Sequence, residues 1–145
     1  MMKRLLFGIF VILFSASVCH SRMVSIANEK VNLRSGPGTK YTVLWELGKG
    51  FPLRVVASKG NWLKVLDFEK DTGWIYKKLI TDKRHLIVKK KRVNIRNNRG
   101  KKGKIIGKAN YGVVFQTLKT RSGWANVKHE NGLTGWIKRD LLWGW

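Results

Sequence analysis

The stretch VNLRSGPG, residues 31–38, returns 62 residues later as VNIRNNRG, residues 93–100. When the comparison is extended at the same shift and without gaps, residues 23–80 and 85–142 share 13 identities in 58 positions. The matches include Trp62 with Trp124, and the block TGWI at residues 72–75 with residues 134–137. The chain of 145 residues therefore contains two copies of one unit.

Each unit has the pattern of short strands. The segments FPLRVVAS (51–58), NWLKVLD (61–67) and GWIY (73–76) are rich in β-branched and aromatic residues, and turn signals separate them. No segment shows the sustained 3.6-residue apolar repeat of an amphipathic helix. We therefore predict an all-β fold in which each unit is a small barrel of about five strands, because closing a sheet removes exposed edges.

Three motifs occur in a fixed order: VNLRSGPG (31–38), GNWLKV (60–65) and GWI (73–75). In this order they resemble the signature of bacterial SH3-like domains, closely in copy one and more loosely in copy two. The resemblance implies two tandem SH3-like β-barrels. It also implies an exported, non-catalytic binding module of the kind found in cell-envelope proteins, where some members bind peptidoglycan peptides.

The first residues form a separate segment. Residues 1–4 are basic in part, residues 5–14 (LLFGIFVILF) are wholly apolar, and residues 15–21 are mostly small, which predicts a signal peptide over 1–21. Ten apolar residues fall short of the ~20 that cross a bilayer core, so cleavage is favoured over a membrane anchor. Val18 before Cys19 disfavours a lipoprotein signal. We expect a periplasmic or secreted protein with domains at 22–82 and 83–145.

The loop that follows Arg34 differs between the copies. Alternation places Val31 and Leu33 on the buried face of a strand, and the sequence SGPG then turns the chain. In the resembled family this loop is one wall of the ligand groove. Two aromatic residues after it become glycines in copy two. The candidate groove residues are Tyr41, Trp45, Trp62 and Trp74, although Trp45 as a core plug, and the two recurrent tryptophans as packing, remain alternatives.

Charge is distributed unequally. The whole chain has a formal charge of +22, and residues 22–82 carry 11 basic and 6 acidic side chains against 17 and 2 in residues 83–145. Basic runs are ordinarily solvated surface, but the same positions in copy one are barely charged, which favours a functional cationic face. Its candidate residues are Lys89, Lys90, Lys91, Arg92, Arg96, Arg99, Lys101, Lys102 and Lys104.

Catalytic and metal-binding patterns find little support. His85 and His129 are 44 residues apart, and the run DFEKD at residues 67–71 is interpreted as a turn rather than an acid–base pair or metal site. Glycine-rich phosphate loops are also missing from the sequence. We therefore expect no enzymatic activity, no cofactor and no metal.

Three functions remain open from the sequence. The favoured one is recognition of a cell-wall peptide or an envelope protein through the aromatic groove of copy one. The alternative is binding of a polyanion through copy two: lipopolysaccharide, anionic lipid, a teichoic-type polymer or, least favoured, nucleic acid. The third is an accessory that packs against an envelope enzyme. Because a unit of this size buries only ~60% of its unfolded surface, we expect the two units to dock.

Overall fold

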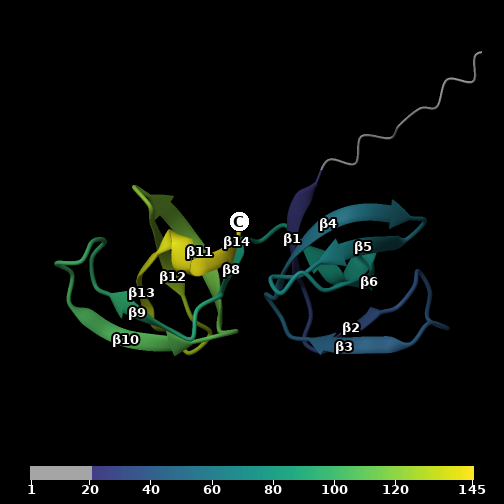
Figure 1. The fold of residues 1–145 in the computed structure, drawn as a ribbon, viewed down its shortest axis with the longest axis horizontal. Helices are drawn as coiled ribbons and strands as arrows, with labels where there is room; N and C mark the ends of the chain where they lie inside the picture. The colour runs from purple at the N-terminus through teal and green to yellow at the C-terminus, as the bar shows by residue number, and fades with distance from the viewer. Residues whose placement is uncertain (1–20) are drawn as a thin grey trace, which may run out of the picture.

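The computed structural model describes residues 21–145, and the predicted signal peptide lies almost wholly outside them. Two curled sheets lie side by side (Figure 1). Barrel 1 contains β1 (Arg22–Ile26), β2 (Val31–Arg34), β3 (Val43–Leu47), β4 (Pro52–Lys59), β5 (Trp62–Leu66), β6 (Thr72–Tyr76) and β7 (Ile80–Thr81). Barrel 2 contains β8 (His85–Val88), β9 (Arg92–Arg96), β10 (Ile105–Asn110), β11 (Val114–Arg121), β12 (Trp124–Lys128), β13 (Thr134–Lys138) and β14 (Leu142–Gly144).

The all-β prediction is confirmed. The helical segments of residues 21–145 are two three-residue 3₁₀ turns, η1 (Lys77–Leu79) and η2 (Arg139–Leu141). In this same part of the chain, no helix has the length and apolar character to cross a membrane.

Both sheets have the same topology. The strand order is β3-β2-β6-β5-β4-β1-β7 in barrel 1 and β10-β9-β13-β12-β11-β8-β14 in barrel 2. The predicted strands at 51–58, 61–67 and 73–76 correspond to β4, β5 and β6. Each barrel has seven strands rather than about five, because the first strand and a short strand after the 3₁₀ turn also pair with each other. β3 and β10 stand at the beginning of these orders, and within residues 21–145 each pairs with one neighbour and leaves its other edge open.

Each barrel has its own core, and the repeated motifs supply it. Val31 and Leu33 are buried and Asn32 is exposed, as the alternation predicted. Glycine in the repeated TGWI block permits close packing: a Cβ on Gly73 would lie 2.5 Å from Leu33 Cγ, and one on Gly135 would lie 2.5 Å from Ile95 Cγ2. These two positions therefore admit no larger side chain without a shift of the neighbouring strand.

The two barrels contact each other, as expected for units of marginal size. Leu86 and Val88 enter the core of barrel 2, whereas Ile87 between them points to the opposite face and is still fully buried. The Phe68 and Tyr111 rings, one from each barrel, have centroids 5.1 Å apart. The Arg54 guanidinium carbon of barrel 1 lies 5.8 Å from the ring centre of Trp143. The interface is thus built from side chains of both copies.

Candidate functional site

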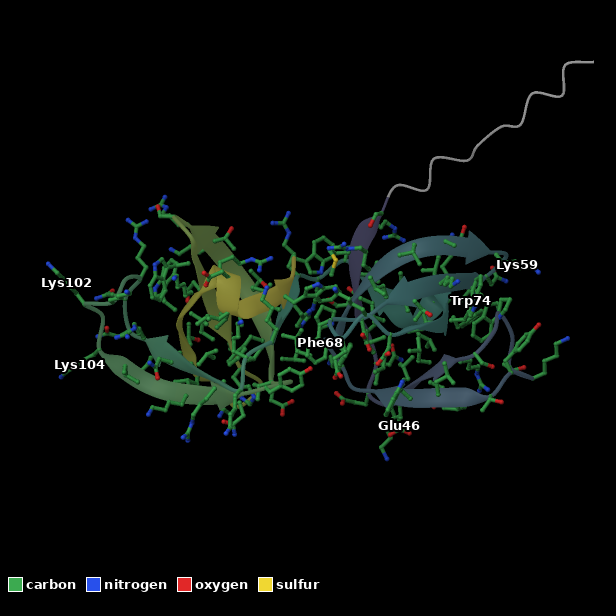
Figure 2. The ribbon with its side chains drawn as sticks, in the orientation of Figure 1. Glu46, Lys59, Phe68, Trp74, Lys102 and Lys104 are labelled. Carbon is green, nitrogen blue, oxygen red and sulfur yellow. The ribbon has the colours of Figure 1, made fainter. Side chains whose placement is uncertain are left out.

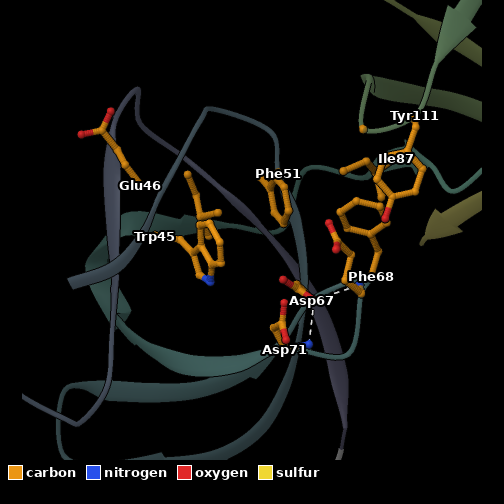
Figure 3. Close-up of a pocket in the computed structure, with 11 residues that line it drawn as sticks. Trp45, Glu46, Phe51, Asp67, Phe68, Asp71, Ile87 and Tyr111 are labelled. Carbon is orange, nitrogen blue, oxygen red and sulfur yellow. Dashed lines mark hydrogen bonds between the residues drawn. The ribbon is translucent and has the colours of Figure 1, made fainter. Parts of the chain in front are cut away.

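A cleft of about 270 Å³ opens where the two barrels meet. We call it the inter-barrel cleft, and Figure 3 shows the Trp45 ring beside Phe51 and near the carboxylates of Asp67 and Asp71. The residues that line it are Trp45, Glu46, Leu47, Phe51, Asp67, Phe68, Glu69, Asp71, Ile87, Tyr111 and Gly112. Barrel 1 contributes most of them, from β3, the start of β4 and the turn between β5 and β6, and barrel 2 contributes the last three.

Trp45 reaches this cleft because of strand register. It lies directly opposite Leu33 in the β2–β3 ladder, and opposite residues of an antiparallel pair project to the same face. Leu33 is in the core, so Trp45 also projects to the inner side of the sheet. No strand of residues 21–145 covers the far edge of β3, and Trp45 remains 58% exposed. The alternative in which this tryptophan plugs the barrel is therefore excluded.

The acidic run at residues 67–71 is a turn, as interpreted from the sequence. Asp67 is only 8% exposed, and its Oδ1 accepts hydrogen bonds from the backbone N–H groups of Glu69 and Asp71, both at 2.9 Å. Lys70 adopts a left-handed φ of 69° to complete the turn. The sequence did not reveal that this turn places its carboxylates near the rings of Trp45, Phe51 and Tyr111, since these come from β3, from the residue before β4 and from the other barrel.

The inter-barrel cleft is acidic within a basic protein. The acidic residues Asp67, Glu69 and Asp71 line it, Glu46 lines it with its carboxylate pointing away (Figure 3), and no lysine, arginine or histidine of residues 21–145 does. The ion pairs formed within residues 21–145 are Arg22 with Asp82 and Lys138 with Asp140, so neither uses a cleft carboxylate. Partial desolvation raises the pKa of the Tyr111 phenol, and the negative charges of Glu69, Asp67 and Asp71 raise it further.

The other predicted aromatics lie elsewhere. Trp62 lines an outer groove of about 630 Å³ together with Arg34 and Tyr76, and the Trp62 and Tyr76 ring centroids are 5.5 Å apart. Trp74 projects outward from β6, opposite Lys64 and Arg34. Tyr41 covers Gly36, where a Cβ would lie 2.4 Å from the tyrosine ring. The structure thus places Trp45 on the inner side and the recurrent tryptophans on the outer side, and a ligand role for each remains a prediction.

The repeated arginine of the opening motif holds its loop. Arg34 Nη1 donates to the carbonyl oxygens of Thr39 at 2.9 Å and Tyr41 at 3.0 Å. Arg96 Nη1 donates in the same way to Lys101 at 3.2 Å and Gly103 at 2.8 Å. The sequence assigned Arg96 to the cationic face and did not reveal this loop contact.

The predicted cationic residues fall into two groups. Lys89, Lys90, Lys91 and Arg92 lie at the start of β9, and Arg96 to Lys104 follow its end. At about 3.3 Å per residue the strand separates the groups by roughly 13 Å. Figure 2 shows Lys102 and Lys104 at the tip of barrel 2 farthest from barrel 1. Whether either group binds an anion remains a prediction.

The two histidines line the same cavity. His85 and His129 both line a second cavity between the barrels, of about 560 Å³, with Glu29, Lys49 and Glu130 among its other residues. No group of three or more His, Cys, Asp or Glu side chains within the described part of the chain is arranged to hold a metal ion.

Comparisons with known proteins agree with the repeat. A family model for the bacterial SH3 domain matches residues 27–82 and again residues 89–144. The chain is 24% identical over 140 residues to a candidate N-acetylmuramoyl-L-alanine amidase, YrvJ, of Bacillus subtilis. That match covers 89% of this chain and 27% of the amidase. The chain therefore spans about a quarter of the length of the curated relative it matches.

Among solved structures, an NlpC/P60 family protein from Bacillus cereus is similar with a TM-score of 0.40 and 16% identity, over 84% of this chain and 56% of that one. The CBD of endolysin LysPBC5 is similar with a TM-score of 0.33 and 20% identity, over 83% of this chain and 90% of that one.

Proposed function

The chain belongs to the bacterial SH3 domain family, in two tandem copies, and from this membership we propose that it is an exported, non-catalytic module that binds peptidoglycan peptides. The name of the matched Bacillus subtilis relative, a candidate N-acetylmuramoyl-L-alanine amidase, supports a ligand from the cell wall. The basic and apolar leader at residues 1–14 supports export.

The observation that carries the proposal is the position of Trp45. Its ring is 58% exposed on an open edge strand and lines a cleft of about 270 Å³. At the same place barrel 2 has Gly107, so the fold does not require an aromatic residue there. An exposed tryptophan that the fold does not need is a strong candidate for ligand contact, because tryptophan is enriched among residues that dominate binding.

The test is a sedimentation assay of the protein with purified peptidoglycan. We expect Trp45→Ala to weaken binding about tenfold or more, since truncating a dominant contact costs ~2 kcal/mol. Leu118→Ala is the matched control, because Leu118 is also exposed, at 46%, but lies on β11 outside the cleft. Unchanged binding by Trp45→Ala would contradict the role of this surface, and capture of an envelope protein in place of peptidoglycan would contradict the ligand class.

A second candidate function is polyanion binding by barrel 2. It is favoured by the net charge of residues 83–145, which carry 17 basic and 2 acidic side chains. Binding of this kind falls steeply with salt, because the Debye length shrinks from about 10 Å at 0.1 M to about 3 Å at 1 M. Sedimentation at both salt concentrations separates the two functions: peptide recognition, which rests mainly on aromatic contacts, weakens little at 1 M salt, whereas binding through many charges is lost.

A further inference from the structure

We propose that the inter-barrel cleft is a receptor for a primary ammonium group, presented by an otherwise uncharged part of the ligand. This inference rests on the proposed function and deepens it, because it names the chemical group that the peptide offers to this cleft. It follows from the carboxylates of the cleft, from its aromatic walls and from its origin in two barrels.

The carboxylates of the cleft lie close together, and no lysine or arginine of residues 21–145 forms an ion pair with them. The chain holds 30 Lys and Arg residues against 8 Asp and Glu, yet Asp67, Glu69 and Asp71 line this one cleft and no basic residue of 21–145 does. Glu46, Asp67, Glu69 and Asp71 form no ion pair within residues 21–145. Like charges gathered in one site repel one another, and a bound cation relieves that repulsion.

Asp67 is the deepest of the four. It is only 8% exposed, and both of its hydrogen bonds are accepted by Oδ1. No hydrogen bond to Oδ2 is found within the described residues, so this oxygen is available to a donor that enters the cleft. An ammonium group brings three N–H donors and no acceptor, which suits a site that offers carboxylate oxygens.

The aromatic walls favour an organic ammonium over a metal ion. The Phe51 and Phe68 ring centroids are 5.9 Å apart, and those of Phe68 and Tyr111 are 5.1 Å apart, which makes a row of rings across the two barrels. Trp45 faces the same space. The face of an aromatic ring attracts an ammonium cation, and tryptophan does so most strongly. Calcium and magnesium prefer six or more oxygen ligands, which rings cannot supply.

The cleft belongs to the tandem arrangement and not to the single domain. At the positions equivalent to Trp45, Glu46 and Asp71, barrel 2 has Gly107, Lys108 and Leu133. Barrel 2 instead closes the cleft of barrel 1 with Ile87 and Tyr111. Its volume of about 270 Å³ suits an aminoalkyl side chain or a peptide N-terminus rather than a whole peptide.

The inference is tested with the full protein by two-dimensional NMR. The probe is N-acetyl-lysine methylamide, which has one free amine, and its Nε-acetylated form is the neutral comparison. We expect the amine probe, and not the acetylated one, to shift the Trp45 indole N–H resonance. We expect the double substitution Glu69→Gln and Asp71→Asn to weaken this binding at least tenfold, whereas Glu130→Gln, which removes one carboxylate outside the cleft, leaves it unchanged.

The outcomes separate this inference from the proposed function. If peptidoglycan with acetylated amines binds as tightly as untreated peptidoglycan, the ammonium receptor is refuted and the peptide-binding function stands. If neither form sediments with the protein while the amine probe still shifts Trp45, the proposed function fails and the receptor stands. Equal shifts from both probes, or shifts from Ca²⁺ alone, would overturn the inference. Unchanged thermal unfolding of the double variant shows that any loss of binding is not a loss of fold.

Discussion

Space, not backbone conformation, requires glycine at positions 73 and 135. Neither residue has a positive φ, but a Cβ at either position would lie 2.5 Å from a core side chain of the neighbouring strand. We predict that Gly73→Ala and Gly135→Ala each destabilise the protein by about 1–3 kcal/mol through overpacking, measured by denaturant unfolding. Gly48→Ala is the control, because a Cβ there meets nothing within 4 Å. Equal effects at positions 48 and 73 would contradict the packing argument.

The repeat predicted which residues recur, but it did not give the physical reason for each. The composition of GWIY (73–76) predicts a strand, β6 confirms it, and β13 stands at the same place in barrel 2. The reason for its glycine lies in Leu33 and Ile95, which approach from another strand. The repeated arginines were likewise expected on an outer face, and their bonds to loop carbonyls depend on how residues 35–42 and 97–104 fold back.

At the level of elements, the β9–β10 loop depends on one arginine. Arg96 Nη1 holds the carbonyl oxygens of Lys101 and Gly103, and hydrogen bonds from a charged donor contribute about 1.5–3 kcal/mol each at most. We predict that Arg96→Ala loses about 1–3 kcal/mol of unfolding free energy and speeds hydrogen exchange at Asn97 N–H, which donates to Lys104 O. Lys102→Ala in the same exposed loop is the charge-matched control. A similar loss in both variants would show that charge, and not the loop contact, is responsible.

The strands could be predicted further than the site. Strand composition and turn residues predict β4, β5 and β6. They do not predict β1 and β7, because these two strands are far apart in the sequence and pair only in the folded barrel. The resemblance to the family groups the four candidate aromatics into one groove, although they come from three separate segments of the sequence. Register separates them: Trp45 lies opposite Leu33 and faces inward, while Trp74 lies opposite Lys64 and faces outward. Cross-strand register is a property of the folded sheet, so the single sequence did not provide it.

At the level of the whole molecule, the burial of His85 predicts that stability depends on pH. Burial lowers the pKa of His85 below 6.5, the positive charges of Lys83 and Lys49 also lower it, and the Lys83 carbonyl opposes them. A histidine whose pKa is lower in the folded state binds fewer protons there than in the unfolded chain. Its stabilising effect is therefore present above pH 6.5 and is lost as pH falls from 6.5 through the folded-state pKa.

We predict that thermal stability of the wild type falls between pH 7.5 and pH 5, and that His85→Gln reduces this fall. The imidazole lies against barrel 1, because a Cβ on Gly50 would be 2.8 Å from His85 Cδ2. His129→Gln is the control, since it removes the other histidine of the same cavity. The pH interval spans the ordinary histidine value. Identical pH dependence in His85→Gln and the wild type would contradict this role.

Docking of the two barrels should depend on Ile87. Its side chain is fully buried but belongs to neither core, since Leu86 and Val88 on either side of it fill barrel 2. We predict that Ile87→Asp leaves both barrels folded and separates them, because an unpaired carboxylate in an apolar interface is strongly unfavourable. The measurement is ¹⁵N relaxation, in which one common tumbling time becomes two shorter ones. Ile105→Asp on the exposed edge strand β10 should keep the common tumbling time of the wild type.

Since Ile87 also lines the cleft, we predict that Ile87→Asp abolishes binding of the amine probe as well. Retention of that binding by separated barrels would show that barrel 1 alone forms the site.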